Sequence, residues 1–176
     1  MGGVVVPYDT PLLLVGDEIQ IESAARALIR VGLDQVDGYL RGGMPAWTGA
    51  GLSVDRTPQI TPRELDHQLA GAAAPVVLDV RTDDEWREGH VPHAAHIMGG
   101  YLPGKLAEVP RDRPVAVMCG TGYRSTIAAS ILARAGFGNV TNVTGGMAAW
   151  KKAGLETTGA QPSVAEVARS VSMVED

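Results

Sequence analysis

The cysteine at position 119 is the only one in the chain, and it opens a loop suited to thiol chemistry. The loop reads Cys119, Gly120, Thr121, Gly122, Tyr123, Arg124 and Ser125. Its two glycines permit a tight curl with inward-pointing N–H groups, the helix expected from Ser125 presents its positive end, and Arg124 adds a charge. We expect these groups to lower the pKa of Cys119 and to make it a nucleophile. The alternative, a structural cysteine at a strand end, leaves the surrounding loop unexplained.

The segments on either side of this loop predict an α/β fold. Residues 75–80 and 115–118 are short continuous apolar runs, typical of strands covered on both faces. They alternate with amphipathic segments such as residues 125–136, which predict helices. We therefore expect a parallel sheet flanked by helices on both faces, with Cys119 at the end of one strand.

An internal repeat divides the chain. Pro11 recurs as Pro114 and Trp47 as Trp150, both 103 positions later. The matching segments are residues 11–15 with 114–118, 23–32 with 125–136, and 42–52 with 145–155. We interpret this as a duplication in which each copy contains a strand, a helix closed by glycine, a short strand and a short helix. The two tryptophans are expected to be core anchors.

Only the second copy is preceded by a complete front half. After a linker at residues 53–60, Thr61 and Pro62 begin a helix expected to reach about Ala70. The further elements expected are a strand at 76–80, a helix at 83–87, a strand at 95–97 and a helix at 103–109. The sequence thus predicts a domain at residues 58–157 and a C-terminal tail at 158–176, in which residues 163–174 either form a helix or fray.

The first copy, residues 1–55, is expected to be an incomplete half repeat. Its two strands and two helices would leave a wide apolar surface exposed. We expect a second copy of the chain, as a homodimer, or another part of a longer parent protein to complete it. Its loop at residues 16–22 contains three acids and neither a thiol nor an arginine, so it would repel an anion. Its expected role is structural.

The domain predicted at residues 58–157 resembles the rhodanese family of sulfurtransferases over about residues 60–157. The motifs that carry the resemblance are Leu78–Arg81, Glu85–Trp86, Gly89–Pro92, the Cys119 loop and Gly145–Trp150. The resemblance implies that Cys119 accepts a sulfane sulfur as a persulfide and passes it to a nucleophile. Loop amides and Arg124 would hold an anionic donor. Asp79 and Arg81 would brace the site from a strand end, although a purely structural ion pair is an equally good interpretation.

The tandem arrangement is similar to that of rhodanese copies fused to a metallo-β-lactamase-fold domain that handles persulfides. This similarity supports a second hypothesis, a non-catalytic or sulfur-relay module of a larger persulfide-handling protein. The first hypothesis, a sulfurtransferase, predicts turnover with a small free donor, whereas the second hypothesis does not. The donors considered are thiosulfate, glutathione persulfide, mercaptopyruvate and a protein persulfide, and the acceptor is a thiol or cyanide. Tyr123 is expected to border the mouth of the site.

Two other chemistries are disfavoured by spacing. The related loop of dual-specificity phosphatases and arsenate reductases is similar to Cys-x5-Arg, with five residues between the cysteine and the arginine. Here only four residues separate Cys119 from Arg124. His93 stands where the rhodanese family usually has glycine, which creates a run of His90, His93 and His96. Pro92 prevents a helix from aligning the three rings, and no thiol or acid is spaced to complete a metal shell. We therefore expect neither a metal nor an organic cofactor.

Composition limits the partners. The chain has 176 residues, of which 45% are apolar, and a formal net charge of −5. Without excess or clustered cations, nucleic acid is not an expected partner. No apolar run approaches the roughly 18 residues of a membrane span, and the N-terminus has no basic region before an apolar core. The expected setting is the cytoplasm, without membrane contact.

Overall fold

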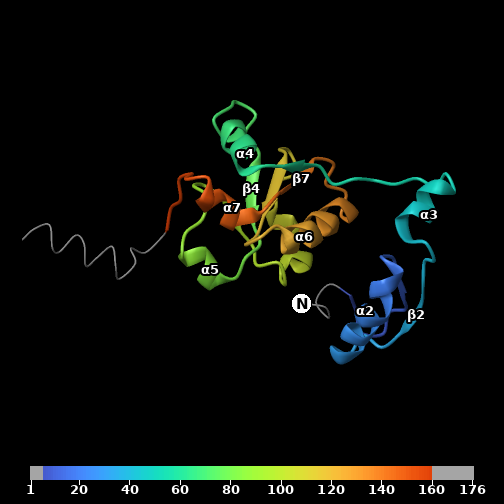
Figure 1. The fold of residues 1–176 in the computed structure, drawn as a ribbon. Coiled ribbons are helices and arrows are strands. Elements are labelled where there is room, and N and C mark those ends of the chain that lie inside the picture. The colour runs from blue at the N-terminus through green and yellow to red at the C-terminus, as the bar shows by residue number, and fades with distance from the viewer. Residues whose placement is uncertain (1–5, 160–176) are drawn as a thin grey trace, which may run out of the picture. The chain divides into compact units, whose positions relative to one another are not determined.

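The computed structural model describes residues 6–159. They belong to two compact units, one ending at Arg56 and the other beginning at Thr57. We call residues 6–56 the first unit and residues 57–159 the second unit (Figure 1). Most of the expected tail, including the segment 163–174, lies outside the described residues.

The second unit is built on a five-stranded parallel sheet with strand order β3-β7-β6-β4-β5. The strands are β3 (Gln59–Ile60), β4 (Val76–Asp79), β5 (Ala95–His96), β6 (Val115–Met118) and β7 (Val140–Val143). The helices are α4 (Pro62–Leu69), α5 (Asp83–Arg87), α6 (Tyr123–Arg134) and α7 (Gly146–Lys152). This topology confirms the predicted α/β fold with a parallel sheet.

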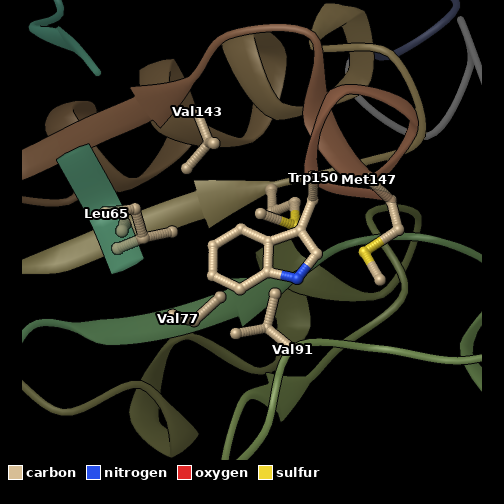
Figure 2. Packing of buried hydrophobic residues seen from close by; sticks show 8 residues of the cluster. Leu65, Val77, Val91, Val143, Met147 and Trp150 are labelled. Atoms are coloured by element: carbon tan, nitrogen blue, oxygen red, sulfur yellow. The ribbon is translucent and has the colours of Figure 1, made fainter. Parts of the chain in front are cut away.

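Helices cover both faces of this sheet because its central strands are apolar on both sides. Alternate residues of β4 and β6, such as Val77 and Ala116, pack with Leu65 of α4 and Trp150 of α7 (Figure 2). Val117, next to Ala116 in the strand, must point to the opposite face, where α6 packs on β6 and β7. All four residues of β6 are buried. The rigid end of β6 therefore provides a fixed support for Cys119.

Two helices of the second unit begin with capping boxes. Thr61 accepts the Glu64 N–H and the Glu64 side chain accepts the Thr61 N–H, as the sequence indicates for α4. Thr82 and Glu85 repeat this arrangement at the start of α5. The second box fixes the Glu85 carboxylate close to the end of β4.

The first unit contains β1 (Leu12–Leu14), α2 (Glu18–Arg30), β2 (Val36–Tyr39) and α3 (Gly43–Gly49), with β1 and β2 paired in parallel. Several of its local hydrogen bonds match those of β6, α6, β7 and α7, although the pairing of β1 with β2 has a register shift between Leu12 and Leu13 that the pairing of β6 with β7 lacks. For example, the Trp47 indole donates to the Ser53 carbonyl at 2.9 Å, and the Trp150 indole donates to the Glu156 carbonyl at 2.8 Å. The two halves thus share backbone geometry as well as sequence.

The prediction that both tryptophans are core anchors is right for Trp150 and wrong for Trp47. Trp150 is 1% exposed, whereas Trp47 is 38% exposed. Trp150 is covered by residues from α4, β4 and the segment at Val91. Residues 6–56 contain no counterpart of that covering layer, so the same local structure leaves Trp47 at the surface.

Several element boundaries differ from the predictions. Helix α6 begins at Tyr123 instead of Ser125, and α2 begins at Glu18 instead of Ser23, because Asp17 caps it by accepting the Ile19 N–H. The expected helix at 103–109 is wrong. That segment forms two 3-10 turns, at Leu102–Gly104 and Leu106–Glu108, separated by Lys105 in a non-helical conformation. Strand β3 lies inside the predicted linker and was missed because it has only two residues.

Candidate active site

Cys119 lies at the carboxyl end of the central strand β6, directly before α6, and its side chain is fully buried. Its sulfur accepts the Gly122 N–H at 3.1 Å and the Ser125 hydroxyl at 3.4 Å. Ser125 is buried as well, and the Gly122 carbonyl, 3.0 Å from its hydroxyl, is a second acceptor for the same proton. The loop is therefore closed around the sulfur atom.

These contacts favour the thiolate form of Cys119. Burial alone raises the pKa of the thiol, because it removes the charged sulfur from water. The hydroxyl and N–H of Ser125, with the N–H groups of Thr121 and Gly122, act in the opposite direction and outweigh burial. The net result is a pKa of Cys119 below its ordinary value, which is the property that a cysteine nucleophile requires.

The other loop residues form the curl around the sulfur. Gly122 has a φ of 97°, and a Cβ there would lie 3.1 Å from the backbone nitrogen of Gly145, so glycine is needed for both conformation and space. Thr121 and Tyr123 are exposed, and Tyr123 is the first residue of α6. That Tyr123 borders the mouth of the site stays a prediction.

Arg124 does not approach the sulfur as an unpaired charge. Its guanidinium forms a bidentate pair with Glu85, with Nη1 donating to Oε2 at 2.7 Å and Nη2 to Oε1 at 2.5 Å. This pair holds the pKa of Glu85 at about 2 and raises the pKa of Arg124. From the sequence alone, Glu85 is recognisable only as part of a motif. Its spacing from Thr82, which signals a capping box, was the sign that its carboxylate would be fixed.

Asp79 and Arg81 form a buried ion pair, with side chains 1% and 4% exposed. The Arg81 Nε lies 2.9 Å from Asp79 Oδ2, and Nη2 lies 2.7 Å from the same oxygen. Arg81 also donates to the carbonyls of Glu85 at 2.7 Å and Gly89 at 2.9 Å. The pair thus holds the middle of α5, at Glu85, and the residue that follows its C-terminal cap. That Asp79 and Arg81 brace the site stays a prediction, and the contact that would do so is the one with Glu85, the partner of Arg124.

The three histidines do not converge. The rings of His90 and His96 both stack on Trp86, with ring centroids 3.4 and 4.7 Å away. His93, whose φ is 60°, lines a cavity of about 440 Å³ beside the first residues of β4, away from Cys119. Within residues 6–159, no group of three or more His, Cys, Asp or Glu side chains is placed to hold a metal ion.

Among the helices of the described residues, none is long and apolar enough to cross a membrane.

Comparisons with known proteins agree with this geometry. The family model described as "Rhodanese-like domain" matches residues 61–153. A protein of Allochromatium vinosum named "Sulfurtransferase" is 34% identical over 97 residues, which cover 55% of this chain and 91% of that protein. The "Thiosulfate sulfurtransferase GlpE" of Stutzerimonas stutzeri is 32% identical, with 51% of this chain and 82% of that protein covered.

Solved structures give the same result. The crystal structure of a rhodanese-related protein from Thermoplasma volcanium has a TM-score of 0.54 and 29% sequence identity, and covers 58% of this chain and 98% of its own. The family match lies entirely within the second unit.

Proposed function

Because the chain belongs to the rhodanese-like domain family, we propose that it is a sulfurtransferase whose Cys119 carries sulfur as a persulfide. The observation that carries the proposal is the buried sulfur of Cys119, which accepts hydrogen bonds from Gly122 and Ser125 and has a lowered pKa. A thiolate in this setting attacks a sulfane sulfur and then holds the terminal sulfur within the same loop. Relatives named as sulfurtransferases support this chemistry.

The transfer proceeds in two displacements. The Cys119 thiolate attacks the outer sulfur of the donor, a new S–S bond forms, and the donor residue leaves with the electron pair of the broken bond, as sulfite when the donor is thiosulfate. A thiol or cyanide then attacks the terminal sulfur of the persulfide, and the Cys119 thiolate leaves. No external oxidant, reductant, metal or organic cofactor is needed for this balance.

The donor we propose is thiosulfate or a low-molecular-weight persulfide. Support for a small donor comes from the closed loop, in which the Cys119 sulfur is fully buried. Support for thiosulfate comes from the name of the Stutzerimonas stutzeri relative. The acceptor is a cellular thiol, for which cyanide substitutes in the assay.

We further propose that residues 1–55 are a degenerate half repeat with a packing role. The matched indole bonds of Trp47 and Trp150 support a duplication. The first unit has glycine at position 16, where the second has Cys119. A second copy of the chain, or another polypeptide segment, would cover its apolar residues.

The test is intact-protein mass spectrometry after incubation with thiosulfate or with glutathione persulfide, followed by cyanide. We expect Cys119 to gain one sulfur atom and to lose it to cyanide, and C119S to gain none. The Ser130→Ala variant is a matched control, because Ser130 is exposed on α6 and bonds only to the Ile127 carbonyl. An unmodified wild-type protein with both donors would overturn the proposal.

A further inference from the structure

The guanidinium of Arg124 is already engaged by a carboxylate of its own protein. Its two terminal nitrogens each donate to one oxygen of Glu85. This paired geometry is the one by which an arginine holds an anionic ligand. An anionic sulfur donor must therefore compete with Glu85 for Arg124.

Glu85 does not depend on Arg124 for its position. Its Oε2 also accepts the Thr82 N–H at 3.0 Å and the Thr82 hydroxyl at 2.9 Å. Its backbone carbonyl is held by Arg81, which is paired with Asp79 in the core. If Arg124 turns toward a ligand, the Glu85 carboxylate stays where it is and keeps its negative charge near that ligand.

The pair lies beside the residue that follows the nucleophile. A Cβ on Gly120 would lie 3.0 Å from Arg124 Nη2 and 3.3 Å from Glu85 Oε1. The side chains of Arg124 and Glu85 are 25% and 34% exposed, so their charges are only partly screened by water. A donor that reaches Cys119 beside Gly120 therefore meets a negative charge as well as a positive one.

We propose that Glu85 is a specificity-determining residue that selects sulfur donors by charge, through its competition for Arg124. It disfavours dianionic donors such as thiosulfate relative to donors with less negative charge beside the transferable sulfur, such as a low-molecular-weight persulfide. The inference rests on the proposed sulfurtransferase function and refines its donor class.

The test compares two donors that share the same reacting bond but differ in charge, thiosulfate and the methanethiosulfonate anion. Values of kcat/KM are measured with cyanide as acceptor for the wild type and for Glu85→Gln. Glutamine keeps an oxygen for the Thr82 N–H and removes the charge. We expect the ratio of kcat/KM for thiosulfate to that for methanethiosulfonate to rise about two- to fivefold, the size of a partly exposed charge interaction, and the rise to shrink in added salt.

Asp84→Asn provides the matched control. Asp84 lies on the same helix and carries the same charge, but it pairs with the exposed Arg87. Its substitution should leave the donor ratio unchanged. Glu85→Ala repeats the comparison if the glutamine variant does not fold.

Two outcomes contradict the inference in distinguishable ways. If Glu85→Gln lowers kcat/KM for both donors equally, or leaves their ratio as in the wild type, Glu85 has no role in donor selection while the persulfide mechanism stands. If wild-type Cys119 gains no sulfur from either donor, the proposed function fails and the inference fails with it.

Discussion

The first unit and the part of the second unit from β6 to α7 have the same order of elements and several matching hydrogen bonds. Only in the second unit are the apolar side chains of these elements buried. Leu13, Val15 and Met44 of the first unit are 75%, 53% and 45% exposed. Their counterparts 103 positions later, Ala116, Met118 and Met147, are at most 2% exposed. Local sequence therefore specifies the turns and helices, whereas burial depends on a second layer.

The second unit shows what that layer consists of. Leu65, Val77 and Val91, from α4, β4 and the segment after α5, complete the cluster around Trp150. In the described part of the first unit, β1 and β2 form a sheet of only these two strands. The buried core of the second unit therefore depends on the residues before β6, whereas the local turns and helices form in both units.

The largest expected effect concerns the ion pairs of the two units. Arg81→Met leaves Asp79 buried without a partner and should reduce the free energy of unfolding of the second unit by about 3–5 kcal/mol. Arg26→Met removes the exposed pair with Glu22 in the first unit and should cost about 0.5 kcal/mol or less. Urea denaturation followed by tryptophan fluorescence measures both. Equal losses would show that the units do not differ in burial.

The second comparison uses two glycines at equivalent positions. Gly43 and Gly146 both have a φ of 54°. A Cβ on Gly146 would collide with the Cys119 carbonyl and with the Gly120 backbone, whereas a Cβ on Gly43 would make a single, milder clash, 2.8 Å from the Gly16 carbonyl. Gly146→Ala should cost about 3 kcal/mol and reduce persulfide formation, and Gly43→Ala should cost about 1 kcal/mol. Circular dichroism during thermal unfolding and the mass assay test this; activity retained in Gly146→Ala would contradict the predicted displacement of the Cys119 loop.

Much of this architecture is predictable because its signals are local. The apolar run of β6, the glycine that ends α6 and the cap of Thr61 each act within a few residues, so the sequence predicts them correctly. The Cys119 loop is also local, and the expected contacts from its amides are present. The boundary errors at α2 and α6 arise because their caps, Asp17 and Gly122, lie farther upstream than the apolar pattern suggests.

The remaining features depend on contacts between distant segments. Glu85 meets Arg124 across 39 positions of sequence, and no spacing rule relates them. The exposure of Trp47 depends on segments without a counterpart in residues 6–56. Strand β3 exists only because Gln59 and Ile60 pair with the edge of β7. Each of these three features forms only when segments distant in the sequence come together, so local sequence patterns do not predict it.

A smaller effect is expected from Ser125. Its hydroxyl stabilises the Cys119 thiolate, whereas the loop at residues 16–22 of the first unit ends with the acidic Glu22. Ser125→Ala should raise the pKa of Cys119, because it removes the hydroxyl that donates to the sulfur. The thiolate is the reactive form, so the rate of persulfide formation falls when the pH drops below the pKa of Cys119. In the variant this fall should begin at a higher pH than in the wild type. Stopped-flow rates across pH detect the shift, Ser130→Ala should show none, and identical profiles would exclude Ser125 as a source of the low pKa.

The last prediction is that a thiol placed at position 16 does not form a persulfide. This position corresponds to Cys119 and borders a cavity of about 440 Å³. The chain there enters α2 at Glu18, Asp17 takes the Ile19 N–H, and Glu18 accepts the Gly42 N–H at 2.9 Å. The Ile19 N–H, the counterpart of the Gly122 N–H that contacts Cys119, is thus committed to a carboxylate, and the nearby carboxylate charges would raise the pKa of a thiol. Gly16→Cys in the C119S background should gain no sulfur by mass spectrometry, and a gain would show that a strand end before a helix suffices without the glycine loop.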